Sequence, residues 1–227
     1  MKKALGLAVL MLFAVSTAAF GQAAMGGDSH DFSSTGPAVN PNLTESLYDD
    51  QICVVCHAPH LDESDAVIVA YEATYLWNRS NSDATTYSMY DSNTIDGTQD
   101  AVPATESKMC LSCHDGSVGL EDFDGNEGGT TVVQDSAKAG TYAAGNLDLS
   151  REHPISLTYD EGADTGLIAP ATAEGDGINL YTDGGVARVE CGSCHDPHLQ
   201  NIDVAAEDNL LRIPNAQSAL CTACHDK

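Results

Sequence analysis

The stretch Cys191-Gly192-Ser193-Cys194-His195-Asp196-Pro197-His198 sets the pattern for the whole chain. The same order of two cysteines, a histidine, a proline and a second histidine occurs at Cys53-Val54-Val55-Cys56-His57-Ala58-Pro59-His60. Shorter copies without the Pro-His extension are Cys110-Leu111-Ser112-Cys113-His114 and Cys221-Thr222-Ala223-Cys224-His225. The 227 residues therefore contain four C-x-x-C-H motifs, and all eight cysteines lie in them.

A C-x-x-C-H motif is typical of covalent haem attachment. Its spacing lets one turn of chain place both sulfurs at one porphyrin edge as thioethers, and the next histidine becomes the proximal iron ligand. Zinc sites and redox disulfides also use Cys-x-x-Cys pairs, but neither requires a histidine after every pair. The sequence therefore predicts four haem c groups. Their predicted thioether residues are Cys53, Cys56, Cys110, Cys113, Cys191, Cys194, Cys221 and Cys224, and their proximal ligands are His57, His114, His195 and His225.

The chain has eight histidines, which is two for each motif. Four of them lie outside the C-x-x-C-H motifs: His30, His60, His153 and His198. We expect these four to be distal ligands, so that every iron is held by two imidazoles. Met25, Met89 and Met109 are alternative axial ligands in principle, but this count leaves no iron for them.

His60 and His198 follow their proximal histidines by only three residues, so neither is expected to bind the iron of its own motif. Pro59 and Pro197 end any helical turn begun by the motif and send the chain away in an extended form. Each second histidine should therefore reach a neighbouring iron, and the haems should be closely packed. The simplest assignment sends each to the second haem of its own half of the chain.

Residues 1–23 have the pattern of a secretory signal peptide: Lys2 and Lys3, then an apolar run over residues 4–15, then small residues. No later stretch approaches about 20 apolar residues, so we predict no membrane span. The mature protein, residues 24–227, is expected to be exported to the cell surface or the extracellular space. The periplasm is the alternative location.

The chain is strongly acidic, with a formal net charge of −25. This charge argues against nucleic acid and anionic membrane as partners. Self-association would have to overcome repulsion through buried contacts, ligand bonds or bound divalent cations. The plainer interpretation of the charge is a solubilising acidic surface on an exported protein.

Aromatic residues make up only 6% of the chain, so the haems must supply much of the buried apolar surface. We predict a mostly irregular, loop-rich multihaem cytochrome c fold, with short helices at the motifs and a few short strands, one of them over residues 130–134. Residues 24–227 should form a single tetrahaem domain. It divides into two duplicated dihaem modules, about 24–135 and 136–227, because each part has an upstream histidine, a motif ending in Pro-His and a motif without that extension.

Four strings carry a resemblance to a known family: Cys56-His57-Ala58-Pro59-His60, Tyr75-Leu76-Trp77-Asn78-Arg79, Cys110-Leu111-Ser112-Cys113-His114-Asp115-Gly116 and His153-Pro154-Ile155-Ser156. They resemble the doubled-CXXCH multihaem cytochromes of metal-reducing and sulfur-cycling bacteria. The motif count and chain length are similar to the OmcE group, whose tetrahaem extracellular cytochromes polymerise into filaments (nanowires). The resemblance implies that one ligand crosses between subunits, and His30 is the best candidate for it. The alternative is that His30 closes a haem of its own chain.

Three functions are compatible with these motifs. The first is an extracellular filament, a homopolymer that conducts electrons through stacked haems to an extracellular acceptor or other redox proteins. The second is a monomeric periplasmic electron shuttle. The third is a multihaem reductase, which needs an iron with an open coordination position. The histidine count leaves no such position, so the sequence predicts electron transfer and no enzyme activity.

Overall fold

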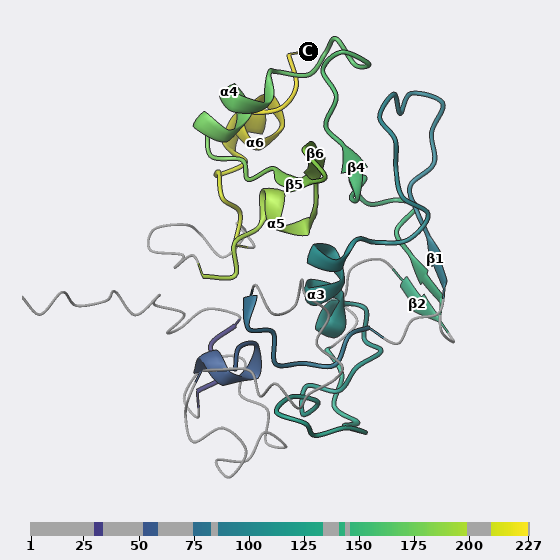
Figure 1. Cartoon of the computed structure of the whole chain (residues 1–227), viewed down its shortest axis with the longest axis vertical. Helices are drawn as coiled ribbons and strands as arrows, with labels where there is room; N and C mark the ends of the chain where they lie inside the picture. The colour runs from purple at the N-terminus through teal and green to yellow at the C-terminus, as the bar shows by residue number, and fades with distance from the viewer. Residues whose placement is uncertain are drawn as a thin grey trace, which may run out of the picture.

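The computed structural model describes residues 30–33, 52–58, 75–82, 86–133, 141–143, 146–198 and 210–226. Most of these residues lie in loops, turns and bends (Figure 1). The longest helix within them is α3 (Thr105–His114), with ten residues. The predicted signal peptide and the predicted ligand His60 lie outside the described residues. The predicted haem core stays a prediction.

Short helices lie at all four motifs. Helix α3 carries the second motif, and single turns carry the others: η1 (Ile52–Val55), α5 (Cys191–Cys194) and α6 (Ala219–Thr222). Each single turn is closed by an amide that donates to the carbonyl four residues earlier: His57 to Cys53 (2.8 Å), His195 to Cys191 (3.1 Å) and His225 to Cys221 (2.9 Å). Residues three apart share one face of such a turn, so both thiols of a motif point the same way.

The first small sheet joins strands that lie far apart in the chain. Strand β3 (Asn146–Asp148) is central; β1 (Thr86–Ser88) pairs with it in parallel and β2 (Thr141–Ala143) antiparallel. The side chain of Leu147, in the central strand, is fully buried. This sheet therefore covers a small apolar cluster beside α3.

The second sheet precedes the third motif. Its order is β4 (Leu157–Thr158), β6 (Val186–Val189), β5 (Tyr181–Asp183), all antiparallel. The two-residue turn between β5 and β6 consists of Gly184 (φ 56°) and Gly185 (φ 87°). Hairpin turns of this length favour positive φ at both positions, which glycine adopts without strain. Strand β6 then leads directly into α5.

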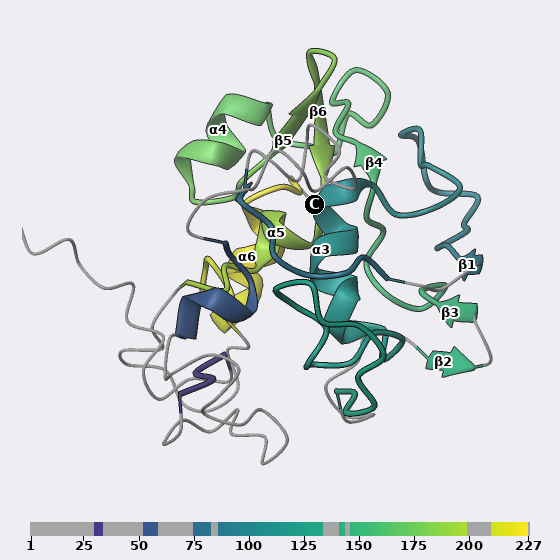
Figure 2. The same cartoon turned by 60° about the horizontal axis from the view of Figure 1, so that its bottom comes forward.

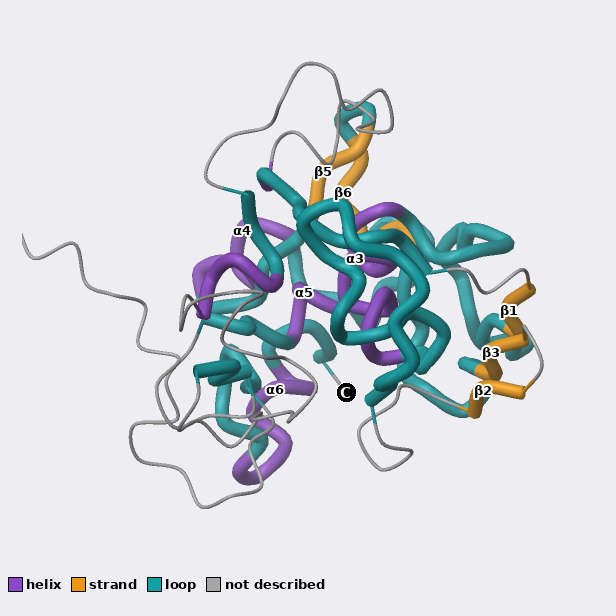
Figure 3. The backbone as a smooth tube through the Cα atoms, turned by 90° about the horizontal axis from the view of Figure 1, so that it is seen from below, coloured by secondary structure: helices purple, strands orange, loops and turns teal. Residues whose placement is uncertain are grey.

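Helices α3 and α5 are neighbours near the middle of the described structure, and the two sheets lie at separate edges (Figures 2 and 3). Helix α4 (Pro170–Gly175), which starts with a proline at its first position, lies close to α6 and the short turn η3 (Ala216–Ser218). The predicted strand over residues 130–134 is wrong where it is described, because residues 130–133 are irregular. The amide of Leu120 donates to the Thr131 carbonyl (2.7 Å), and the Thr131 amide donates to Glu121 Oε2 (3.3 Å).

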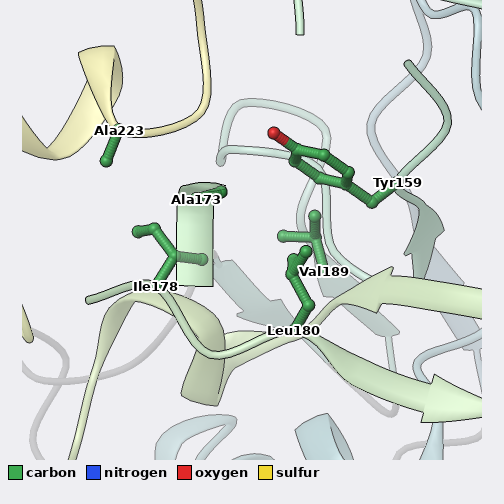
Figure 4. Close-up of a cluster of buried hydrophobic side chains, with 6 residues drawn as sticks. All are labelled: Tyr159, Ala173, Ile178, Leu180, Val189 and Ala223. Atoms are coloured by element: carbon green, nitrogen blue, oxygen red, sulfur yellow. The ribbon is translucent and has the colours of Figure 1, made fainter. Parts of the chain in front are cut away.

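The polypeptide core of the described residues is divided into three small clusters. The largest contains Tyr159, Ala173, Ile178, Leu180, Val189 and Ala223 (Figure 4). The other two are Phe32, Val55 and Phe123, and Leu111, Leu147 and Leu149. Each cluster includes a residue from inside a C-x-x-C-H motif: Ala223, Val55 and Leu111. Apolar packing is therefore concentrated around the motifs.

Candidate haem-attachment sites

All eight cysteines belong to the described residues, and none is in a disulfide. Burial raises the pKa of the Cys56 thiol to about 12 and that of Cys194 to about 11. At neutral pH these sulfurs are therefore protonated in the chain itself. They lie in apolar surroundings, as suits sulfurs that join a porphyrin edge.

Three motif histidines each lie beside a histidine from outside the motifs. The ring centres of His114 and His30 are 5.8 Å apart, those of His57 and His198 are 5.9 Å apart, and those of His225 and His153 are 6.5 Å apart. The His57 and His198 rings are nearly parallel, with an interplanar angle of 22°. Six of the eight histidines are thus brought together in pairs, and each pair has one motif member.

These separations fit a haem iron between two imidazoles. Metal–imidazole bonds of about 2.0 Å, with each ring centre about 1 Å beyond its nitrogen, put two opposed ring centres about 6 Å apart. The three observed separations lie within about half an ångström of that value. The residues present therefore fit six-coordinate haem c at the first, second and fourth motifs.

His198 pairs with the motif of the other half, so the simplest assignment above is wrong for this residue. Its amide donates to Oδ1 of Asp196 (2.9 Å), and Asp196 is held by Arg212 Nη1 (3.1 Å). This tight turn directs the histidine towards His57 and away from His225. His225 instead lies beside His153, which belongs to the same half of the chain.

His30 lies beside His114 of the same chain, the arrangement that the alternative interpretation described. Burial, with smaller effects of the His114 and His198 imidazoles, lowers the pKa of His30 to about 4. Its ring is therefore neutral at pH 7, as an iron ligand must be. Because His30 also senses His198, the histidine pairs of the first and second motifs are neighbours.

The tautomer of the first motif histidine is set by the backbone. His57 Nδ1 lies 2.7 Å from the carbonyl oxygen of Tyr75, so Nδ1 carries the proton and donates it. The Nε2 lone pair is then left for a metal ion, which is the usual role of such an outer hydrogen bond. The Trp77 ring packs edge-on against the His57 ring at 6.2 Å and limits its rotation.

Three of the proximal histidines each lie beside an extended segment, which forms backbone hydrogen bonds with the residues directly before and after the histidine. We call this arrangement a clamp. At the first motif, the backbone amide of Asn78 donates to the Cys56 carbonyl (2.9 Å), and that of Ala58 donates to the Leu76 carbonyl (2.8 Å). At the third motif, Arg212 donates to Cys194 (2.8 Å) and Asp196 to Leu210 (2.9 Å). At the fourth motif, Ile168 donates to Cys224 (2.8 Å) and Asp226 to Gly166 (2.9 Å). No sequence pattern predicts these clamps, because their segments share only an apolar residue at the middle position.

Glu190, immediately before the third motif, is also a residue that the sequence analysis did not find. Its buried carboxylate accepts from the hydroxyls of Ser107 (2.6 Å) and Ser156 (2.9 Å), and Arg188 Nε lies 3.5 Å away. Ser107 belongs to α3, and its oxygen accepts the amide of Cys191 (3.1 Å). Desolvation raises the pKa of Glu190, and the two hydroxyls oppose that rise. The carboxylate therefore ties the third motif to the helix of the second.

Thiols of consecutive motifs lie within electrostatic reach of each other. Cys110 and Cys191 interact most strongly: the interaction raises the pKa of the Cys110 thiol and lowers that of Cys191. The other interacting pairs are Cys56 with Cys113, and Cys194 with Cys224. The four motifs thus follow one another in space in the order of the chain.

Comparison with known families bears on the end of the chain. Residues 184–227, which contain the third and fourth motifs, match the family model described as the doubled CXXCH motif. No curated protein matches the chain. A doubled CXXCH motif indicates a multihaem c-type cytochrome, with covalently bound haem c and a role in electron transfer. In the part of the chain that the structure describes, no helix has the length and apolar character needed to cross a membrane.

Proposed function

We propose that the chain holds four haem c groups, each with its iron between two imidazoles, and that it carries electrons from one to the next. The three histidine pairs, each about 6 Å between ring centres and each with one motif histidine, carry this proposal. They account for the first, second and fourth motifs. By count, His195 of the third motif and His60 form the fourth ligand pair.

Bound haem c supplies a one-electron ferric/ferrous couple. The histidines of the chain would hold each iron, and they would leave no position at which a substrate could bind it. Two imidazoles fill both axial positions, so no iron is left open for a reacting molecule. Cys110 of the second motif and Cys191 of the third lie within electrostatic reach of each other, which supports close haem edges there. These features favour electron transfer over a reductase.

The haem count and ligation are tested on the secreted protein. Intact mass should exceed that of the mature chain by four haem groups, and the electron paramagnetic resonance spectrum of the oxidised protein should contain only low-spin ferric signals. A mass increment of fewer than four groups contradicts the count. A high-spin signal from the native protein, or carbon monoxide binding after reduction, contradicts the ligation and restores the reductase.

For the assembly, we propose an extracellular filament in which the N-terminal segment of one copy ligates a haem of the next. This proposal is supported by the resemblance to filament-forming tetrahaem cytochromes and by the acidic charge, which a metal–ligand bond between copies would offset. The monomeric periplasmic shuttle is favoured by a different observation, the position of His30 beside His114 of its own chain.

Electron micrographs and light scattering of the native secreted protein separate these two assemblies. The filament predicts long uniform polymers that disappear in His30→Ala, while the variant keeps four covalent haems. The shuttle predicts monomers, and His30→Ala then changes only the ligation of one iron. Polymers that persist in His30→Ala would contradict the donated ligand and leave another interface to hold the filament.

A further inference from the structure

We infer that Arg79 is an electrostatic tuning residue: its buried guanidinium raises the reduction potentials of the haems at the first and second motifs. The inference rests on the proposed electron-transfer function. It assigns a role in setting those potentials to a side chain outside the motifs, which neither the motifs nor the family match contains. The observations that carry it are burial, the kind of atoms around the guanidinium, and the contrast with the arginines of the second half.

Arg79 lies between the segments of the first two motifs. Its Nη2 donates to the Gly119 carbonyl (2.8 Å), and its Nη1 donates to Leu120 (3.0 Å) and to Val55 (3.4 Å). Val55 lies inside the first motif, and Gly119 and Leu120 lie on the loop that leaves the second. The residue is only 7% exposed, and its Nε is buried without a hydrogen-bond partner among the described residues. The cation is therefore in a desolvated position shared by two attachment sites.

The atoms that surround this guanidinium carry no net charge. All three acceptors are backbone carbonyls, and no carboxylate of the described residues lies within 4.0 Å of it. Two buried carboxylates on neighbouring segments are bound elsewhere. Asp115 accepts from Ser82 Oγ and the Ser117 amide, and Asp122 accepts from the amides of Gly119 and Gly129. The positive charge of Arg79 is thus left uncompensated at close range.

The guanidinium lies beside both attachment segments. Val55, whose carbonyl accepts from Nη1, is the residue before Cys56 of the first motif. Gly119 and Leu120, whose carbonyls accept from Nη2 and Nη1, follow His114 of the second motif by five and six residues. The charge therefore acts on both sites.

The second half places its arginines differently. Arg212 donates to the Gly192 carbonyl through Nε (2.7 Å), and its Nη1 pairs with Asp196 Oδ2 (3.1 Å). Arg188 pairs with Asp100 and contacts the buried carboxylate of Glu190. Both cations are therefore balanced by carboxylates at close range, whereas Arg79 is not.

The effect on electron transfer follows from charge balance. Each step moves one electron from a ferrous to a neighbouring ferric haem; one iron is oxidised as the other is reduced, and no proton or other reactant is needed. A ferric haem carries one more positive charge than a ferrous haem, so a fixed cation nearby favours the reduced form. Arg79 therefore favours the reduced form of the first and second haems.

The test is a spectroelectrochemical redox titration of the fully loaded protein and three variants, with intact mass confirming four haems in each. In Arg79→Gln, which keeps amide donors but no charge, two of the four one-electron components should shift to lower potential. We expect about a tenfold change in the equilibrium between the two pairs, which is about 59 mV for one electron. Arg79→Lys should retain most of the wild-type potentials, and Arg151→Gln, which removes an exposed and therefore screened charge, should shift them much less.

The inference is overturned if Arg79→Gln leaves all four components in place, or if Arg151→Gln produces an equal shift. Asp196→Asn provides a second test that leaves Arg79 intact. It removes the counter-charge of Arg212 and should raise the potential of a second-half haem; a fall or no change contradicts the electrostatic reasoning. The haem mass and low-spin signals of the same samples report separately on the proposed function.

Discussion

The first and third motifs are held by the same backbone arrangement and by different side chains. In both, the segment after the motif returns antiparallel and brackets the proximal histidine with two backbone hydrogen bonds. In both, a side chain from that segment donates to the carbonyl of the second motif residue: Asn78 to Val54 (2.7 Å) and Arg212 to Gly192 (2.7 Å). The geometry of attachment is repeated, whereas the charge around it is not.

This comparison separates two roles of the polypeptide. Backbone hydrogen bonds fix where each haem is attached, and they tolerate any side chain that preserves the clamp. Charged side chains then differ between the halves: an uncompensated arginine in the first, a buried carboxylate and paired arginines in the second. Duplicated haem sites can thus acquire different potentials without any change in attachment.

The largest expected effect concerns ligation across the halves. His198→Ala should convert one haem from low-spin to high-spin, because the His57 site loses its second imidazole. The single tryptophan locates that haem, since the Trp77 ring lies 6.2 Å from the His57 ring. Its indole resonance should broaden strongly in the NMR spectrum of His198→Ala.

The matched variant is His153→Ala, which should also create one high-spin haem but leave Trp77 unchanged, because His153 pairs with His225. Added imidazole should restore the low-spin form in both. A His198→Ala protein with four low-spin haems, or with an undisturbed Trp77 resonance, would show that the two halves do not exchange this ligand.

The next effect concerns Glu190, the buried carboxylate that directly precedes the third motif. Glu190→Ala removes the acceptor of two buried hydroxyls and a partner of Arg188, which should lower the free energy of unfolding by about 3–5 kcal/mol. Glu161→Ala, at an exposed position, is the control and should change stability by less than about 0.5 kcal/mol. Chemical denaturation of both proteins checks the difference; equal midpoints would contradict it.

The same carboxylate predicts a pH dependence. Desolvation raises the pKa of Glu190 above 4.5, so the folded chain binds its proton more tightly than the unfolded chain. Its contribution to stability is therefore full below pH 4.5 and is lost as pH rises through the folded pKa. Glu190→Gln cannot titrate, so its unfolding free energy should fall less than that of the wild type between pH 4.5 and 7. A larger fall in the variant would reverse the sign of the argument.

The smallest effect concerns the leucine at which the clamps of the first and third motifs begin. Leu76 (φ 52°) and Leu210 (φ 57°) both have left-handed backbone, which costs about 1 kcal/mol relative to glycine. Leu76 is 38% exposed, so Leu76→Gly should raise the free energy of unfolding by up to about 1 kcal/mol. Leu210 is 6% exposed, and Leu210→Gly should lower it by about 2 kcal/mol, because the buried side chain outweighs the relieved strain. Effects of the same sign in the two variants would contradict this balance between backbone strain and side-chain burial.

Local features of the sites could be predicted from the sequence, and long-range ones could not. The C-x-x-C-H spacing predicts a helical turn with both thiols on one face, because that geometry depends on a few consecutive residues. The destination of His198 depends on the Asp196–Arg212 ion pair and on where the first motif lies, and neither is visible three residues from His195. Arg79 stands in a recognisable string, yet its burial follows from carbonyls more than 20 positions away. Histidine counting therefore predicts the ligands and leaves their partners undetermined.

The proximity of Cys110 and Cys191 has a consequence for maturation. In an oxidising compartment, neighbouring thiols that close into a disulfide are lost to thioether formation. One such bond would take one sulfur from the second motif and one from the third. We therefore expect haem attachment to precede the docking of α5 on α3, or a reductant to keep this pair as thiols until attachment.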